Sequence, residues 1–223
     1  MKINAIIFDM DGTIIDTEHI WEQATKKLIT ARGIDFTDEL KATLCDQLAG
    51  FGLRPCCELI KKELNLADSV DTLAHEKVNT AYKLYEKGVK FINGFLEFHE
   101  QLMMRDLKVG IATNADEKTI ELTNKALNLE KLFGQHIYSF CHVNNIGKPD
   151  PAVYLHASKQ LAVQPAYCIA IEDSAHGITA AKKAGMFCIG INTANAREQL
   201  QNADLIINSY HELDLELLLT KKS

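Results

Sequence analysis

The chain has 223 residues, of which 47% are hydrophobic and 24% charged, and this near-average composition excludes disordered, collagen-like and coiled-coil proteins. Thirty acidic and 24 basic residues leave a net charge of −6, which argues against the basic surface that nucleic-acid binding requires. No apolar run approaches the roughly 20 residues that cross a bilayer.

The six cysteines show no Cys-x-x-Cys spacing, so we expect free thiols rather than a zinc site or a disulfide framework. The N-terminal residues lack the long apolar stretch and small-residue cleavage site of a secretory signal. We therefore expect a cytoplasmic protein without nucleic-acid or membrane partners, and we take a monomer as the working expectation.

The chain opens with a short apolar run, residues 3–8, that is typical of a strand buried in a parallel sheet. Residues 17–88 then show only helical patterns, and the predicted helices are 18–31, 38–44, 55–64 and 69–86. A helix at 95–105 follows, and further strands are predicted at 108–112, 168–171, 187–191 and 204–207. After residues 168–171, Ser174 is a candidate N-cap and Gly185 a candidate end of the next helix.

Strand, polar turn and helix in repetition predict an α/β fold, a Rossmann-like parallel sheet with helices on both faces. The helical stretch that interrupts this pattern predicts an inserted all-α domain after the first strand. We predict that residues 1–16 and 89–223 form the α/β core domain and that residues 17–88 form a helical cap domain.

Polar side chains follow the predicted strands at their carboxyl ends, where open α/β sheets place ligands. Each one alone could serve as a turn residue or a helix cap, as Thr113 could for a helix beginning near Asp116. Together at one sheet edge they predict a site. Its members are Asp9, Asp11, Thr113, Asn114, Glu172 and Asp173, together with Lys148 from the loop ahead of the strand at 168–171.

This set of side chains suits phosphoryl transfer through an aspartyl-phosphate. A carboxylate such as Asp9 can attack phosphorus and divide one displacement into two. Asp11 lies two residues on, faces the same side of an extended segment, and could protonate the leaving oxygen and then deprotonate water. Lys148 could meet the charge of the transferring group. Paired carboxylates repel each other without a cation, and Mg²⁺ prefers such oxygen ligands.

The sequence resembles the haloacid dehalogenase-like hydrolase superfamily, and within it the β-phosphoglucomutase-like sugar phosphatases with a helical cap. The resemblance covers nearly the whole chain. Its most specific stretches are FDMDGT at 8–13, GKPDP at 147–151 and IEDS at 171–174.

The resemblance implies a role for each member of the site. Asp9 would be the nucleophile and Asp11 the acid/base, while Thr113, Asn114 and Lys148 would hold the phosphoryl group. Mg²⁺ would bind Asp9, the Asp11 main-chain carbonyl and Asp173, with Glu172 close by. The cap would close over a small phosphorylated metabolite, a sugar phosphate.

Three positions bear on the reaction type. Asp11 argues against dehalogenation, because dehalogenases of the superfamily lack this acid. Mutases of the family usually carry a histidine four residues after the position of Thr17, where this chain has Trp21, and often a lysine where it has Ala49. Both departures favour hydrolysis over a mutase.

Two cap residues are candidates for substrate contact. Trp21 could stack on a sugar face or simply pack in the cap core. Arg54, in the cap loop 48–54, could contact a second anionic group or be solvated.

Other functions stay open at the level of sequence. A phosphosugar mutase would use the same acids. A phospho-accepting signalling domain also places acids, a threonine and a lysine around Mg²⁺, but such domains are about half this length and carry the acceptor on a middle strand. A catalytically silent binding protein is disfavoured, since no expected catalytic group is missing.

Overall fold

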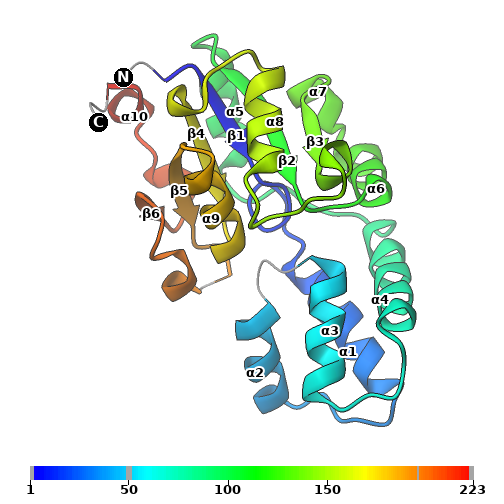
Figure 1. Ribbon diagram of the computed structural model, residues 1–223. Coiled ribbons are helices and arrows are strands. Elements are labelled where there is room, and N and C mark those ends of the chain that lie inside the picture. Colours follow the sequence, from blue (N-terminus) through cyan, green and yellow to red (C-terminus); the bar gives the residue numbers. More distant parts are fainter. Residues whose placement is uncertain (1–2, 49–51, 195, 221–223) are drawn as a thin grey trace.

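Short apolar segments form one six-stranded parallel sheet in the computed structural model, which describes residues 3–48, 52–194 and 196–220. The strands are β1 Ala5–Phe8, β2 Lys108–Thr113, β3 Ile137–Ser139, β4 Cys168–Glu172, β5 Phe187–Ile191 and β6 Leu205–Ile207. Their order is β3-β2-β1-β4-β5-β6, so β1 lies between β2 and β4 (Figure 1). Phe8 is level with Ile111 and with Ile171. The carboxyl ends of these three strands therefore reach the same sheet edge.

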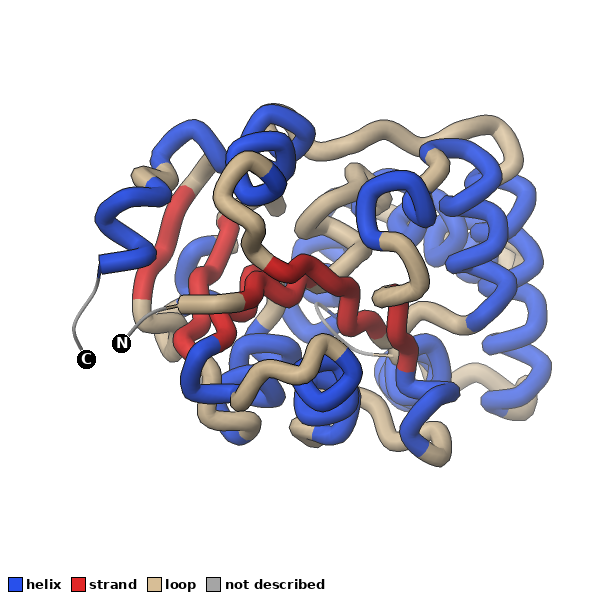
Figure 2. Tube along the Cα trace, turned by 90° about the horizontal axis from the view of Figure 1, so that it is seen from above, coloured by secondary structure: helices blue, strands red, loops and turns tan. Residues whose placement is uncertain are grey.

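Alternate residues of β1 belong to two different apolar cores, as the two-residue period of a strand requires. Ile6 and Phe8 pack in one core and Ala5 and Ile7 in the other, and all four are fully buried. Helices lie on both sides of the sheet (Figure 2). The first core takes side chains from α5 Phe95–Met103, α6 Glu117–Leu127, α7 Leu129–Phe133 and α10 Leu215–Thr220, and the second from α8 Ala152–Gln160 and α9 Ala175–Lys183.

The predicted fold class is confirmed, and the strands agree with prediction except for β3. β3 is the outermost strand beside β2, and its three residues are too few to show a hydrophobic period. Its pairing with β2 places it in the sheet. The helix after β4 is capped as predicted, because the Ser174 hydroxyl accepts a hydrogen bond from the Gly177 N–H. Gly185 follows its end with a left-handed φ of +80°.

The insert after β1 consists of α1 Glu18–Thr30, α2 Asp38–Leu48, α3 Leu53–Glu63 and α4 Val70–Tyr85, which lie together below the sheet in Figure 1. Two helices are longer than predicted at the ends that flank residues 49–51. Pro55 stands in the first turn of α3, where its missing N–H costs no hydrogen bond, so the helix begins before it.

The insert has an apolar core of its own, formed by residues including Leu28, Ile29, Ile60 and Leu73. Buried residues of α1 and α4 instead pack in the first core beside the sheet, namely Ile20, Ala24, Ala81, Leu84 and Tyr85. The separate core supports the division into residues 1–16 with 89–223 and residues 17–88, which remains a prediction.

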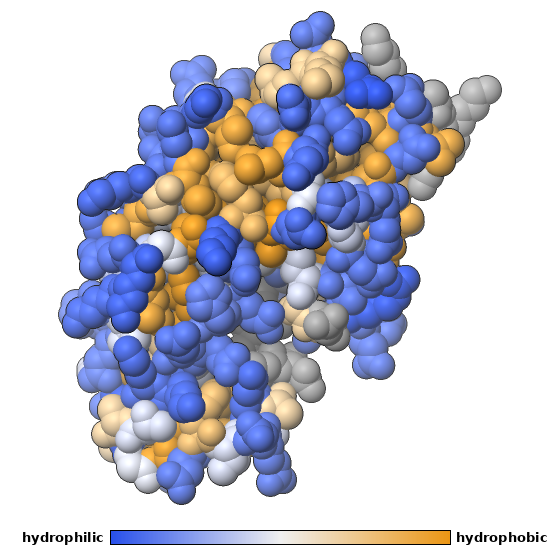
Figure 3. Space-filling view, turned by 180° about the vertical axis from the view of Figure 1, so that it is seen from behind, coloured by the Kyte–Doolittle hydropathy of each residue, from blue (hydrophilic) through white to orange (hydrophobic). Residues whose placement is uncertain are grey.

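The helix α5 is apolar on two sides. Phe95, Phe98 and Leu102 are buried against the sheet, whereas Leu96 and Met103 are 45% and 48% exposed. The view from behind (Figure 3) shows apolar side chains gathered over the half of the molecule that contains the sheet.

Among the described helices, none combines the length and the apolar character needed to span a membrane.

Candidate active site

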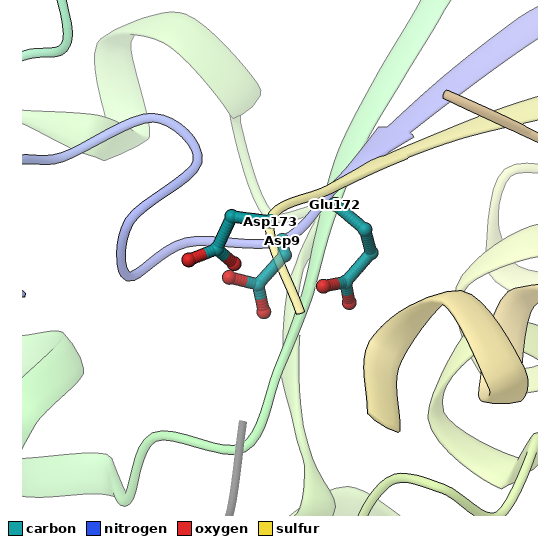
Figure 4. Close-up of side chains that lie close together, drawn as sticks. All are labelled: Asp9, Glu172 and Asp173. Carbon is teal, nitrogen blue, oxygen red and sulfur yellow. The ribbon is translucent and has the colours of Figure 1, made fainter. Parts of the chain in front are cut away.

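Three carboxylates converge where β1 and β4 end. Asp9 directly follows β1, Glu172 is the last residue of β4, and Asp173 comes next (Figure 4). Each contributes an oxygen to a group whose members all lie within 4.8 Å of one another. Glu172 is fully buried and Asp9 is 7% exposed. Such closely spaced buried acids require a compensating positive charge.

Lys148 supplies part of that charge. Its Nζ lies 2.5 Å from the Asp9 Oδ1 atom and 2.5 Å from the Glu172 Oε1 atom. Burial opposes its ionisation, but the two carboxylates outweigh that effect and raise the pKa of Lys148. The lysine therefore stays charged and ties the ends of β1 and β4 together.

Asn114 holds the loop that carries Lys148. Its Oδ1 atom accepts a hydrogen bond of 2.9 Å from the Lys148 N–H, and its Nδ2 atom donates to the Lys148 carbonyl at 3.4 Å. The structure thus assigns Asn114 a positioning contact that the sequence does not reveal, because 34 residues separate the two positions.

Tyr154 and Ser174 complete the surroundings of Glu172, and neither is among the predicted site residues. The Tyr154 hydroxyl donates to Oε1 over 2.7 Å, and the Ser174 hydroxyl donates to Oε2 over 3.2 Å. A Cβ atom at Gly177 would lie 1.9 Å from Oε1, so only glycine leaves room for this carboxylate. The one feature of the sequence that could point to Tyr154 is its position on α8, directly after the loop 147–151 that carries Lys148.

The remaining negative charge is suited to a metal ion. Burial and the neighbouring Glu172 raise the pKa of Asp173 to about 8, and burial raises that of Asp9 despite the opposing Lys148. A Cβ atom at Gly12, where φ is +77°, would lie 2.1 Å from the Asp173 Oδ2 atom. The chain therefore approaches Asp173 as only glycine can. Carboxylate oxygens in this arrangement are the donors that Mg²⁺ prefers.

Asp11 is held on the side of the helical insert. Its Oδ1 atom accepts hydrogen bonds from Thr17, over 2.8 Å, and from the Tyr85 hydroxyl. Burial raises the pKa of the Asp11 carboxyl, while hydrogen bonds from Tyr85, Thr17 and Trp21 lower it. The Asp11 side chain does not belong to the group of three carboxylates described above. The metal contact predicted for Asp11 is through its main-chain carbonyl, not through its side chain, and it stays a prediction.

Tyr85 is a site residue that sequence reasoning misses. It lies 74 residues after Asp11, and no spacing rule connects the two. Burial raises the pKa of its hydroxyl well above the usual value, which keeps the hydroxyl protonated and able to donate.

Thr113 lies at the end of β2 and is 1% exposed. Its hydroxyl accepts a hydrogen bond of 3.0 Å from the Ala115 N–H. The cap of α6 is Asp116, whose side chain accepts from the Thr119 N–H over 2.7 Å. The alternative in which Thr113 caps this helix is therefore wrong, and Thr113 lines the cavity described next.

A cavity of about 1220 Å³ lies between the sheet edge and the insert, with Asp9, Asp11 and Lys148 in its wall. Trp21 and Arg54 line it from the insert. The Trp21 ring is edge-on to that of Tyr85, with ring centres 6.3 Å apart.

Arg54 is 60% exposed and makes ion pairs with Asp71 and, over 3.6 Å, with Glu58. Two acids therefore lie beside the Arg54 guanidinium, and its contact with a second anionic group of the substrate stays a prediction. Ala49, Gly50 and Phe51 of the same predicted loop lie outside the described residues.

Comparison with known proteins covers both the sheet and the insert. A family model described as haloacid dehalogenase-like hydrolase matches residues 6–191. Validoxylamine A 7'-phosphate phosphatase of Streptomyces hygroscopicus subsp. limoneus is 30% identical, with 93% of this chain and 94% of that protein covered. The phosphorylated carbohydrates phosphatase of Thermotoga maritima is 28% identical, with 82% of each covered.

Solved structures show the same architecture. The crystal structure of β-phosphoglucomutase from Clostridium difficile matches with a TM-score of 0.79 and 26% identity, covering 97% of this chain and 95% of that one. The similarity therefore includes the region of the helical insert.

Proposed function

Because this chain belongs to the haloacid dehalogenase-like hydrolase family, we propose that it is a phosphatase that hydrolyses small phosphomonoesters, with sugar phosphates as its substrates. The observation that carries this proposal is the placement of Asp9 beside Lys148 in the wall of a cavity that the insert covers. A carboxylate nucleophile and a buried cation are thereby available at one point.

The reaction that these side chains support has two steps. The Asp9 carboxylate attacks phosphorus and forms an aspartyl-phosphate, while Asp11 gives a proton to the departing alcohol oxygen. Asp11 then takes a proton from water, which attacks the same phosphorus and releases phosphate. Lys148 balances the negative charge on the phosphoryl oxygens, and the Thr113 hydroxyl donates a hydrogen bond to them. Asn114 keeps Lys148 in place through its main chain.

We further propose Mg²⁺ as the cofactor, held by Asp9, Asp173 and the Asp11 carbonyl. Both oxygens of Glu172 already accept hydrogen bonds from side chains, so Glu172 contributes mainly by fixing Lys148. When bound, the ion reduces the repulsion between the attacking carboxylate and the phosphoryl oxygens.

A mutase is the second candidate, favoured by the similarity to β-phosphoglucomutase. Against it, the position expected to carry histidine is Trp21. The nearest imidazole, His19, lies 3.6 Å from Asp16 and its side chain is 54% exposed. We therefore place hydrolysis first.

The test is phosphate release from a panel of sugar phosphates, glycerol phosphate and nucleoside monophosphates. We expect release from at least one sugar phosphate, loss of activity with a chelator and recovery with Mg²⁺. Isomerised hexose phosphate without free phosphate would show a mutase instead. The absence of release from every member would contradict the proposal.

Changing Tyr85 to phenylalanine tests how Asp11 is positioned. Removal of one donor to Oδ1 leaves the carboxyl less well oriented, and we expect a roughly tenfold lower kcat/KM for a sugar phosphate, since kcat/KM reports the step in which the alcohol leaves. The effect on 4-nitrophenyl phosphate should be smaller, because that leaving group needs no proton. Steady-state kinetics on both substrates measure the difference.

Tyr82→Phe is the matched control, since Tyr82 lies on the same helix and donates to Asp116 over 2.8 Å instead. It should leave the ratio of the two substrates unchanged. Equal losses of kcat/KM on both substrates in Tyr85→Phe would indicate a structural role only.

A further inference from the structure

A cysteine and a lysine of the insert form a buried pair that the proposed hydrolysis does not use. Cys56 on α3 and Lys77 on α4 are each 4% exposed. The Lys77 Nζ atom lies 2.7 Å from the Cys56 Sγ atom. Two helices therefore bring an amine and a thiol into direct contact, although 21 residues separate them.

Among the described residues, no carboxylate forms an ion pair with Lys77. Its Nζ atom instead lies 5.8 Å from the centre of the Trp21 ring. A buried ammonium group needs a nearby anion. The sulfur of Cys56 is the atom placed to provide it.

The pKa values of other buried thiols, one adjacent to Cys56 and one on β4, shift in the opposite direction. A hydrogen bond from Cys57 and the charge of Lys77 lower the pKa of Cys56 to about 6, against the effect of burial. The contact with Cys56 and burial raise the pKa of Cys57, and burial raises that of Cys168 to about 12. The thiolate is the nucleophilic form of cysteine, so Cys56 differs from these buried thiols in reactivity.

Cys56 and Lys77 also line the cavity that contains Asp9. A change in the size or charge of this pair therefore alters the space in which the substrate binds. A small electrophile that enters the cavity reaches the sulfur by the same route.

We propose that Cys56, paired with Lys77, is a site of reversible oxidation by small hydroperoxides and that its oxidation lowers the activity of the enzyme. In this step the thiolate attacks the terminal oxygen of hydrogen peroxide, an S–O bond forms and the O–O bond breaks. The sulfur loses two electrons to the peroxide, and the departing hydroxide takes a proton from the Lys77 ammonium group. The products are a sulfenic acid, a neutral amine and water.

This step replaces an ion pair with two neutral groups and adds an oxygen atom beside the cavity. The packing of α3 against α4 and Trp21 then has to adjust. We expect lower phosphate release after oxidation, and recovery after reduction with dithiothreitol, because sulfenic acids are reducible by thiols.

The experiment treats the folded protein with hydrogen peroxide at pH 7, then denatures it, alkylates the remaining thiols and counts each cysteine by mass spectrometry. Cys56 should be lost at least tenfold faster than Cys168 and Cys188. Lys77→Met should slow the loss of Cys56 at least tenfold, whereas Lys83→Met, at an exposed position of the same helix, should not.

Activity is followed in parallel as the rate of phosphate release by the treated protein divided by that of the untreated protein. Cys56→Ser should make this ratio insensitive to peroxide, and Cys57→Ser should not. Loss of Cys56 no faster than the two buried strand thiols would overturn the proposal, as would a Cys56→Ser variant that remains peroxide-sensitive. The comparison among cysteines needs no variant to fold, and it stands even if the proposed phosphatase activity is not found.

Discussion

Replacing Asp9 with asparagine is expected to abolish phosphate release from an aryl phosphate in Mg²⁺, by about a thousandfold or more, while the fold survives. The amide has the same shape but cannot act as the carboxylate nucleophile. Lys148 keeps its second partner, Glu172, at 2.5 Å. One buried acid whose pKa is raised by burial is removed, so the free energy of unfolding without metal should not fall.

Asp150→Asn is the matched control for this variant. Asp150 lies in the neighbouring lysine loop, is exposed, and accepts a hydrogen bond from the Ala152 N–H over 2.9 Å. It should retain most of the activity. Phosphate release gives the rates and circular dichroism checks the fold; turnover by folded Asp9→Asn at the rate of the unchanged protein would refute the proposed nucleophile.

Replacing Lys148 with methionine should reduce both stability and activity. The Lys148 side chain is 3% exposed and bridges two buried carboxylates, which would lose their compensating cation. Breaking a buried ion pair in this way costs roughly 3–5 kcal/mol in free energy of unfolding. Activity should fall at least about a hundredfold, because the phosphoryl group loses a positive charge. Added Mg²⁺ should restore part of the stability by binding the folded state.

Urea unfolding with and without Mg²⁺ measures these changes. Lys183→Met is the control, since Lys183 is exposed and its Nζ atom lies 3.5 Å from the Pro149 carbonyl of the same loop. It should change the free energy of unfolding by less than about 0.5 kcal/mol. Adding Glu172→Gln to Lys148→Met should recover stability, because one uncompensated charge is removed. A Lys148→Met protein as stable as the parent without metal would contradict the argument.

The core of the fold can be predicted from the sequence, because the buried strands of a parallel sheet are continuous apolar runs. The runs that become β1, β2 and β4 each end in the polar residues that meet at the sheet edge, so the sequence alone is enough to place Asp9 and Asp173 together. The edge strand β3 is the exception. Its three residues are too few to show the hydrophobic period of a strand, and only their pairing with β2 makes them a strand.

Contacts between residues far apart in the chain depend on the tertiary structure. The acid Asp11 is predictable from its spacing to Asp9, but its donor Tyr85 comes from the far end of the insert. The pairing of Lys77 with Cys56 likewise depends on how α4 packs beside α3. Arg54 is a further case, since its pairing with Asp71 depends on how α3 packs beside α4, while its contact with substrate stays a prediction.

The sequence by itself determined the fold class and the family and predicted the acidic residues of the candidate site, because these follow from local hydrophobic runs and from short motifs at strand ends. Only the tertiary structure decided which side chains support those acids and what lines the cavity. The physical reason is that a hydrogen bond or an ion pair depends on distances of about 3 Å. The packing of whole helices sets those distances, and no local pattern records it.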